Sequence, residues 1–446
     1  MNLLPSPSGE ARYESPDSVR AVFLAGDAGA RLLAGPPASA GAEGLSSHLG
    51  RLGAPSALAG ADLVEVVAAS GLKGRGGAGF PVAQKLNTVR VSAGKPLVVV
   101  NCSESEPASA KDRTLVRLRP HLVLDGAAVA ARAVGASQAV LYLHRGDLRS
   151  ARALDAAVAE RKQAAIADPD FSVAWAPPRY VAGESSAIVR FLEGGEAKPR
   201  FGTRAAICGV NCAPTAIHNV ETLAHLALVD RMGPDEFRRC GTPGFSGSVL
   251  VTLAGAVQHP GLVAELVAPV PASELLGVAG ISSPPQALLV GGYGGAWIDG
   301  RSAWDSHIWP DALLQGGISV GCGLVGVFPN GACGVRETSG ILSYLASESA
   351  GQCGPCRYGL DHLANSLARL AKGEAGRREL KALERKAASI VGRGACSHPD
   401  GAVSLLRHCL EVFEADIRSH SQRRPCRAAH SDSVFPLPSQ IEQTWR

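Results

Sequence analysis

The stretch "HLVLDGAAVAARAVGASQAVLYLH" (residues 121–144) decides the fold class, because it predicts a helix that leads directly into a strand. Residues 121–136 have a helical pattern, and the apolar run at 138–144 is typical of a buried strand. A second buried strand is predicted at 96–101 ("PLVVVN") and a further helix at 148–165. Such alternation indicates an α/β domain with a mostly parallel sheet, which closes near residue 240.

Beyond this domain the pattern changes twice. Residues 243–325 predict two strands, a helix and another strand, an order that suggests a small β-grasp-like module. Residues 330–420 are predicted to be helical, because leucines recur there at steps of three and four. The Pro-, Ala-, Gly- and Ser-rich residues 1–45 are expected to form a flexible arm, and residues 421–446 a polar, frayed tail.

Composition narrows the class of protein. The chain has 446 residues, a net charge of +4 and scattered basic residues, which gives no case for nucleic-acid binding. We find no signal peptide and no apolar stretch of membrane-spanning length, so we expect a cytoplasmic protein without a membrane span. Thiols stay reduced in that compartment, so we expect the 11 cysteines to form no disulfide framework. They are expected to be buried thiols, with at most one metal or cluster site among them.

A glycine-rich loop and several polar turns suggest a nucleotide-sized site. "GRGGAG" (74–79) matches a dinucleotide fingerprint, although a predicted helix precedes it where the usual unit has a strand. The predicted strand at 96–101 ends in a turn that holds Glu104 and Glu106. Residues 180–200 predict a strand, a Gly-Glu pair and a helix, and residues 214–222 open another helix with polar side chains. Open α/β sheets bind ligands beyond the carboxyl ends of their strands, so these turns are expected to line one crevice.

A cysteine pair marks a second candidate site. "SESAGQCGPCRYG" (347–359) contains Cys353 and Cys356, while Ala350 stands where a third cysteine would complete the run. Cys396 lies in a predicted loop, "GACSHPDGA" (394–402). Spacing alone leaves open an iron–sulfur site, a zinc knuckle, a redox dithiol or a chance pair. The remaining cysteines are predicted to be packing or free thiols: Cys102, Cys208, Cys212, Cys240, Cys322, Cys333, Cys409 and Cys426.

A set of motifs in one order resembles a known family. The motifs are "SGLKGRGGAGFPVAQK", "VNCSESEP", "KDR", "GESSAIVRFLEG", "KPR", "PTAIHNVETL", "ESAGQCGPCRYGL" and "FEADI". Together, over roughly residues 45–420, they resemble the NADH-oxidising flavoprotein of bacterial respiratory complex I, its F subunit, and related components of hydrogenases and formate dehydrogenases. A membrane-associated ferredoxin–NAD oxidoreductase is a weaker match, because it carries two full ferredoxin-type cysteine runs that this chain lacks.

The resemblance implies a fold and a set of site residues. It implies a Rossmann-like α/β flavin domain (46–242), the β-grasp module (243–325) and a four-helix iron–sulfur bundle (330–420). By the same resemblance, Glu106 is the catalytic carboxylate beside the nicotinamide. Cys353, Cys356 and Cys396 hold a [4Fe–4S] or [3Fe–4S] cluster, with His398, Asp400, Ser349 or solvent as a further ligand. FMN and NAD(H) are expected against Gly74, Arg75, Gly76, Gly77, Phe80, Lys85, Asn101, Ser103, Glu104, Gly183, Glu184, His218 and Asn219.

The chain also departs from the family pattern. Ser103 and Ser185 stand in place of carboxylates, and two NADH-stacking aromatic positions fall on Thr88 and Ala205. The resemblance therefore implies that the flavin cradle is kept while the surface for the nicotinamide cofactor is reduced.

The implied function is that of an NADH dehydrogenase-like flavoprotein. It would accept a hydride at FMN and pass single electrons through the cluster to other redox subunits, such as a [2Fe–2S] or ferredoxin-like protein, in a complex that can dock at a membrane. The alternatives are a non-catalytic homologue of the F subunit that serves assembly or electron relay, and a small-molecule binding module built on the β-grasp unit.

Overall fold

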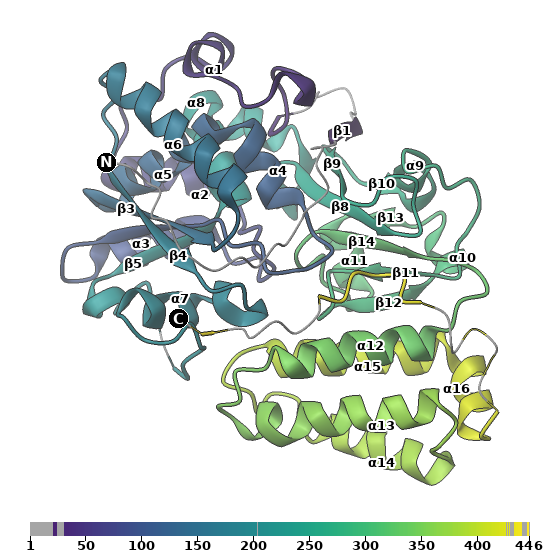
Figure 1. The fold of residues 1–446 in the computed structure, drawn as a ribbon. Helices are drawn as coiled ribbons and strands as arrows, with labels where there is room; N and C mark the ends of the chain where they lie inside the picture. Colours follow the sequence, from purple (N-terminus) through teal and green to yellow (C-terminus); the bar gives the residue numbers. More distant parts are fainter. Residues whose placement is uncertain are drawn as a thin grey trace.

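The computed structural model describes residues 21–24 (backbone only), 31–202, 204–424, 426, 428, 432–438 and 444–445. Most of the expected arm, residues 1–20 and 25–30, therefore lies outside the described residues. Within the described residues the chain forms two large sheets, two two-stranded sheets and a group of C-terminal helices. Figure 1 shows the two large sheets and the helices as adjacent parts.

The first part is a four-stranded parallel sheet between helical layers, in the order β4-β3-β2-β5. Its strands are β2 (Leu97–Asn101), β3 (Gln138–His144), β4 (Asp170–Ala176) and β5 (Thr215–Asn219). Its helices are α1 (Leu45–Leu52), α2 (Gly60–Ser70), α3 (Val82–Val91), α4 (Lys111–Leu118), α5 (Pro120–Val134), α6 (Leu148–Gln163), α7 (Ser185–Leu192) and α8 (Val220–Arg238). Short 3₁₀ turns occur at η1 (Ala38–Ala40), η2 (Tyr180–Gly183) and η3 (Val210–Cys212).

Alternate residues of the buried strands face opposite layers. Val98 and Val100 of β2 pack with the helices α2, α3, α5 and α8, whereas Val99 packs with α7. A strand that is apolar on both faces needs this double cover. The α/β fold with a mostly parallel sheet, expected from the sequence, is confirmed.

The second part is a six-stranded mixed sheet in the order β1-β9-β8-β14-β11-β12. Its strands are β1 (Ala21–Leu24), β8 (Val249–Gly255), β9 (Leu262–Leu266), β11 (Ala287–Val290), β12 (Ala296–Asp299) and β14 (Leu324–Phe328). Around it lie β6 (Gly241–Thr242), β7 (Phe245–Ser246), β10 (Val270–Pro271), β13 (His307–Ile308), α9 (Ala272–Gly277), α10 (Gly300–Ala303) and α11 (Pro310–Gln315).

The N-terminal segment, expected to be a loose arm, is fixed where it is described. Strand β1 pairs in parallel with β9, with Ala21 opposite Val263. The buried carboxylate of Glu265 accepts the backbone N–H groups of Leu32 at 2.7 Å and Leu33 at 2.9 Å. The composition of this segment is that of a linker, but its backbone groups find partners more than 200 residues away.

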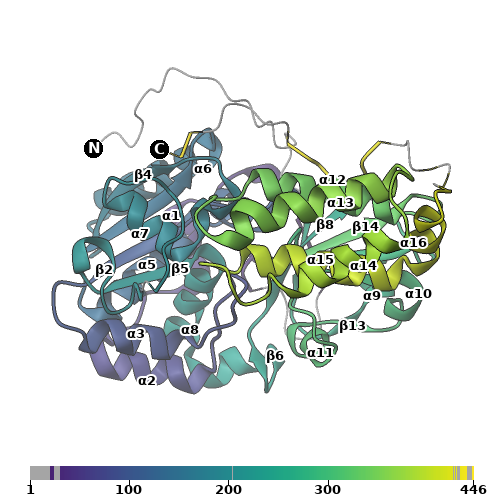
Figure 2. The same ribbon diagram turned by 90° about the horizontal axis from the view of Figure 1, so that it is seen from below.

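The third part consists of helices that pack on one face of the mixed sheet, at the end that carries β12 (Figures 1 and 2). They are α12 (Gly334–Ser347), a π-helical turn η4 (Pro355–Leu360), α13 (Asp361–Ala371), α14 (Arg377–Ala388), α15 (His398–Val412) and α16 (Glu414–Ser421). The expected leucine stripe is buried, since Leu360, Leu363 and Leu367 are each at most 2 % exposed.

The tail is less frayed than we expected. The backbone N–H groups of Val434 and Phe435 both donate to Glu337 on α12, at 3.0 Å. The ring of Phe435 is 1 % exposed and packs against Trp297 with ring centres 6.0 Å apart. Val434 and Leu437 pack against the same core, so a short apolar group within a polar segment binds this part of the tail.

Two further predictions were wrong in detail. The segment from residue 180 is the turn η2 rather than a strand, and the strand of that unit is β4, ten residues earlier. The loop at 394–402 gives way to α15 at His398. In both places turn-forming residues lie close to an element boundary, where a sequence pattern is least informative.

Candidate functional site

The topology of the parallel sheet places a crevice at its carboxyl edge. The chain proceeds from β2 outward to β3 and β4, then returns to the other side of β2 as β5. The last residues of β2 and β5, Asn101 and Asn219, are paired neighbours in this sheet. Because the strand order reverses between them, the connections beyond these two strands diverge, and ligands of open α/β sheets bind at such a point.

The glycine loop lies over this reversal point. It connects α2 to α3, and the N–H of Gly74 donates to Phe80 O at 2.9 Å to close the loop. Gly76 faces the end of β5, since a Cβ built there would lie 3.5 Å from the Cβ of Asn219. Gly77 has a φ of +98°, a conformation that glycine adopts at low cost.

The side chain of Arg75 points away from this crevice. Its guanidinium donates to Ser246 O at 2.6 Å and lies 4.1 Å from the centre of the Phe245 ring. Burial lowers the pKa of Arg75 to about 10. Only the backbone of Arg75 is therefore placed to contact a ligand, while the side chain joins the glycine loop to the second sheet.

Lys85 and His218 line the β5 side of the crevice. Lys85 Nζ donates to Ile217 O at 3.0 Å, and burial lowers the pKa of this lysine. His218 is buried, and its Nε2 has no hydrogen-bond partner among the described residues. Burial, together with the charge of Lys85, holds the pKa of His218 well below its usual range, so the ring is neutral.

The end of β2 is connected to the turn η2. Asn101 Nδ2 donates to Gly183 O at 3.0 Å, and Asn101 Oδ1 accepts the Ser103 hydroxyl at 2.7 Å. A Cβ at Gly183 would lie 2.9 Å from Ser103 Oγ. A side chain at this position would force Ser103 to move, which explains a glycine between the two turns.

Glu104 and Glu184 act as caps of helices that start at the crevice. Glu104 accepts the N–H groups of Asp112 at 3.1 Å and Arg113 at 3.2 Å, at the start of α4. Glu184 accepts the N–H of Ser186 at 2.8 Å as the N-cap of α7. Each carboxylate satisfies amides that would otherwise lack partners, so both also have a structural role.

Glu106 occupies a buried position between the first part and the mixed sheet. Its Oε2 accepts the hydroxyl of Tyr180 and the N–H of Tyr293, each at 3.0 Å, while Oε1 is buried without a partner among the described residues. Burial raises the pKa of Glu106 to about 7. A carboxyl group that changes charge near neutral pH can follow the charge of a bound cofactor.

We expect Glu106→Gln to make the protein more stable at pH 8 but not at pH 5. The pKa of Glu106 is higher in the folded state, so its stabilising contribution is complete at low pH and is lost as the pH rises through about 7. Glutamine mimics the neutral acid, and the gain at pH 8 is at most about 3 kcal/mol in the free energy of unfolding. Urea unfolding at both pH values measures it, and an equal difference at the two values would contradict the assignment.

The three residues at positions expected to face NADH, Phe80, Thr88 and Ala205, are all at least partly exposed. Phe80 is 49 % exposed, and Thr88 lies half-buried on α3 with its hydroxyl bonded to Gln84 O at 2.8 Å. Ala205 is half-buried in the loop between α7 and β5, and the N–H of Thr215 donates to its carbonyl oxygen at 2.8 Å.

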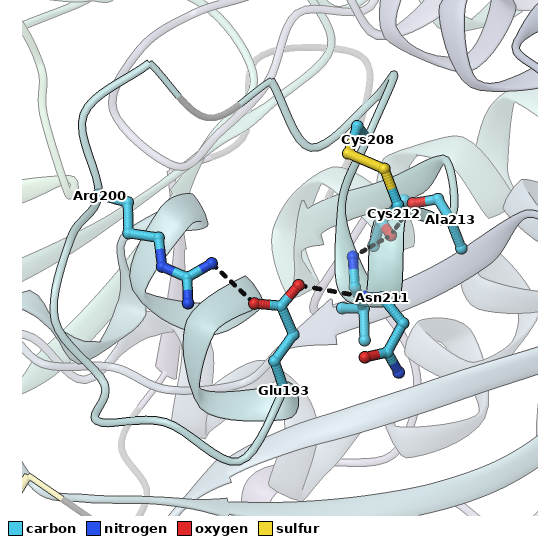
Figure 3. Close-up of a disulfide and its surroundings, with 8 residues drawn as sticks. Glu193, Arg200, Cys208, Asn211, Cys212 and Ala213 are labelled. Atoms are coloured by element: carbon cyan, nitrogen blue, oxygen red, sulfur yellow. Dashed lines mark hydrogen bonds and ion pairs between the residues drawn. A yellow bond between two sulfur atoms is a disulfide. The ribbon is translucent and has the colours of Figure 1, made fainter.

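The same loop contains a disulfide that the sequence did not predict. Cys208 and Cys212, expected to be packing or free thiols, are bonded to each other. Figure 3 shows Glu193 beside this loop, where it accepts from Arg200 at 2.8 Å and from the N–H of Asn211 at 3.2 Å. The turn η3 brings the two cysteine Cα atoms to 4.2 Å, which a spacing of four residues in an extended loop would not suggest.

The three cysteines of the second candidate site come together at the start of the helical part. Cys356 is buried in the π-helical turn, and its thiol interacts with Cys353 and Cys396 and with the hydroxyl of Ser349. Cys396 receives the N–H of His398. The three sulfurs are not all within 4.8 Å of one another in the described chain, as a single ion would require. A cluster suits them better, because each sulfur then binds a different iron.

Of the side chains considered as a further cluster ligand, Ser349 is placed best. His398 Nε2 is engaged with Leu345 O at 2.8 Å, and Asp400 accepts the N–H of Gly392 at 2.8 Å. Ala350 carries no ligating atom. Ser349 also accepts the N–H of Gly351 at 3.1 Å, but its hydroxyl contacts Cys356, so it is the candidate side chain nearest the cysteines, with solvent as the alternative.

The two candidate sites are neighbours. Tyr180, which binds Glu106, packs against His398 with ring centres 5.5 Å apart. The Tyr180 N–H donates to Glu348 at 2.8 Å, and Glu184 is close enough to influence the charge of Cys396. A cofactor at the sheet edge would thus lie near the cysteine loop without any rearrangement of the fold.

A cleft of about 180 Å³ runs along the glycine loop. It is lined by Gly74, Arg75 and Gly77 of that loop, by Lys111 and Glu221, and by Phe245, Asp311 and Leu314 from beyond the first sheet. Asn101, Ser103 and Glu184 do not line it. The cleft therefore joins the glycine loop to the groove between the first two parts and does not reach the turn at the end of β2.

Several residues of the site were missed from the sequence. Tyr293 reaches Glu106 from the loop between β11 and β12, where Gly292 is needed because a Cβ there would lie 2.5 Å from Glu106 Oε2. The glycines in "GGYGG" (291–295) were the available signal. Lys111 and Glu221, 2.7 Å apart, form a buried ion pair beneath the crevice. Lys111 looked like part of a solvated turn.

Comparison with known proteins gives consistent matches. Residues 67–228 match the family described as the Nuo51 FMN-binding domain, and residues 337–420 match the NADH-ubiquinone oxidoreductase-F iron-sulfur binding region. The chain is 33 % identical over 380 residues to the second NADH-quinone oxidoreductase F subunit of Rhizobium meliloti, covering 82 % of this chain and 90 % of that protein. It is 32 % identical over 400 residues to the NADH-quinone oxidoreductase F subunit of Streptomyces coelicolor, covering 85 % and 88 %.

Solved structures show the same likeness. The chain is similar to a chain of an NAD+-reducing [NiFe]-hydrogenase in the H2-reduced state, with a TM-score of 0.74 and 28 % identity. The match covers 80 % of this chain and 62 % of the hydrogenase chain, so this chain spans less than two thirds of that relative. In the described part of this chain, no helix combines the length and apolar character that crossing a membrane requires.

Proposed function

Because this chain belongs to the family of NADH-quinone oxidoreductase F subunits, we propose that it is an NADH-oxidising flavoprotein within a larger redox complex. The observation that carries this proposal is the adjacency of a crevice at the strand reversal and a three-cysteine loop, connected through Glu106, Tyr180 and His398. Two matched family regions, one for FMN and one for an iron–sulfur cluster, cover these same two sites.

The residues at the reversal point fit FMN. Buried polar atoms without partners are rare in proteins, and two of them, Glu106 Oε1 and His218 Nε2, occur here among the described residues. Gly76 packs close to Asn219 and has no side chain to shield its backbone, so a flat ring or a phosphate can approach the loop there. Bound FMN accepts two electrons together and releases them singly. Beside it, Lys85 would supply positive charge and Asn101 a fixed amide.

We propose roles for the remaining residues on the same basis. Glu106 would hold or release a proton near the nicotinamide, and Phe80 would stack on NADH at the rim. Cys353, Cys356 and Cys396, with Ser349, would hold the cluster that receives single electrons. The partner would be another redox subunit of the [2Fe–2S] or ferredoxin-like kind, and the complex would operate in the cytoplasm, where it can dock to a membrane assembly.

The finer fold assignments are also proposals. The β8–β9 hairpin, helix α9 and the parallel pair β14–β8 support a β-grasp-like module. The buried leucines of α12, α13 and α15 support a helical bundle that carries the cluster.

Anaerobic purification tests the proposed function. We expect a yellow-brown protein with about one flavin and three or four irons per chain, whose flavin absorbance is bleached by NADH. Flavin and iron without bleaching by NADH or NADPH would instead support the non-catalytic relay. A colourless protein without iron would contradict both.

We expect NADH to bind more weakly than to relatives that keep all three aromatic side chains. A lost aromatic contact costs about 0.5–1.5 kcal/mol, so Thr88 and Ala205 together raise the dissociation constant by roughly one to two powers of ten. Thr88→Phe is expected to recover about tenfold of the affinity. Anaerobic titration of flavin bleaching measures this value, and Asn87→Phe, next to Thr88 but exposed on α3, is the matched control. Micromolar affinity in the unaltered protein would refute the expectation.

A further inference from the structure

We propose that Cys333, His420 and Cys426 bind a zinc-class metal ion at the far end of the helical part, apart from the iron–sulfur loop. The three ligand atoms all lie within 4.8 Å of one another. Among the described residues, this is the group of three histidine, cysteine or carboxylate side chains that come close enough to share one ion. Cys333 and His420 are buried, and Cys426 is half-buried. The sequence pattern indicated only packing or free thiols at both cysteines, because 87 residues separate Cys333 from His420.

The distance between the ligands suits one tetrahedral ion. Bonds of about 2.3 Å to sulfur and about 2.0 Å to nitrogen place these two ligands about 3.5 Å apart around zinc. Cys333 Sγ and His420 Nε2 lie 3.5 Å apart. An iron–sulfur cluster would need its sulfurs further apart, so this group and the cysteine loop at 353–396 suit different metals.

The histidine is oriented as a metal ligand. Its Nδ1 is 3.3 Å from Leu370 O at the end of α13, so Nδ1 carries the proton and donates it. Nε2 then presents its lone pair toward the two cysteines, where the backbone N–H of Cys426 lies 3.4 Å away, a long contact that an ion would replace. Histidines that bind metals usually donate their other ring N–H to a carbonyl or carboxylate, which fixes the tautomer in this way.

Burial raises the pKa of the free Cys333 thiol to about 12, so a thiolate there depends on the ion, and the start of α12 offers it one contact. This residue is the N-cap of α12, and the N–H of Arg336 points to its sulfur at 3.5 Å. The positive end of the helix stabilises a negative sulfur there. Asp416 lies one turn before His420 on α16 and accepts the N–H of Gly334, but it stands outside the group of three, so a water is the expected fourth ligand.

Such an ion would fasten the tail to the start of α12. Cys426 follows α16, and the chain then returns to Glu337 through Ser433, 2.7 Å away. Two thiolates and an imidazole are ligands that zinc favours, and a site with three protein ligands that join distant segments stabilises the folded chain.

Metal analysis of the full-length protein tests the site. We expect about one zinc per chain beside the iron. Cys426→Ser should lower zinc at least tenfold and leave flavin and iron unchanged, whereas Cys353→Ala should lower iron and leave zinc unchanged. Cys409→Ser is the matched control, since this buried thiol of the same helical part lies outside the group.

Two measurements on the unaltered protein do not depend on how a variant folds. Exchange of zinc for Co²⁺ should give long-wavelength bands of a thiolate-bound tetrahedral ion. Chelation should increase tryptic cleavage after Arg423 severalfold, whereas the Arg424–Pro425 bond resists trypsin in either state. Zinc below about a tenth per chain, with both thiols free or joined in a Cys333–Cys426 disulfide by mass spectrometry, would overturn the proposal.

Discussion

Gly76→Leu is expected to give a folded protein that contains no flavin. Gly76 has an ordinary φ, and a Cβ there would meet Asn219 at 3.5 Å, a normal contact, so the backbone tolerates a side chain. A leucine would however fill the space between the glycine loop and the end of β5. Overpacking of this kind costs up to about 3 kcal/mol, and at that cost flavin affinity falls about a hundredfold, enough to lose the flavin during gel filtration.

Flavin absorbance after gel filtration, relative to protein, measures the effect. Gly50→Leu is the matched control, because this glycine of α1 also has an ordinary φ and nothing within 4 Å of its added Cβ. Iron content should stay normal in both variants. Full flavin occupancy in Gly76→Leu would show that FMN does not lie against this loop.

Cys396→Ala is expected to remove the iron–sulfur cluster and leave the flavin bound. A cluster with three thiolates already has one weak position, and loss of a second thiolate leaves too few bonds to retain iron. Cys396 lies in a loop before α15 rather than inside a helix, so the substitution removes a ligand without a packing defect in the core.

Iron and sulfide analysis with electron paramagnetic resonance of the reduced protein measures the cluster. NADH should still bleach the flavin of the variant, while transfer to a one-electron acceptor protein stops. Cys240→Ala, a buried thiol beyond the first sheet, is the control and should keep the cluster. Unchanged iron in Cys396→Ala would show that the motif does not bind a cluster through this residue.

The sequence was informative where burial is local. The strands predicted at 96–101 and 138–144 match β2 and β3 almost residue for residue. A strand that is covered on both faces is a continuous apolar run, so its own side chains are enough to identify it in the sequence. The polar turns after Asn101 and before Val220 were correctly placed near one edge, since the carboxyl ends of parallel strands share that edge. The family resemblance was confirmed by the matched relatives.

The sequence was silent where the contact is distant. Tyr293 reaches Glu106 from another part of the fold, and the glycines around it indicate a close approach without indicating which residue is approached. The Cys208–Cys212 bond depends on an unusual turn, and the group around His420 depends on how the helices pack. Arg75 lies in a motif that suggests a ligand contact, yet its guanidinium is used to join two sheets.

The mixed sheet is complete only when strand β1, near the N-terminus, pairs with β9, which is far later in the sequence. Ala21 pairs with Val263, so the edge strand leaves the ribosome roughly 240 residues before its neighbour, a delay of about 10–50 s at ordinary translation rates. During that interval the first sheet can form, but the N-terminal strand has no partner and β9 does not yet exist. Completion of the second sheet is therefore a late, non-local step, and such steps fold slowly and leave strand edges exposed. The nascent chain would need protection in that period, and a product that terminates before β9 would present an unpaired strand to its neighbours.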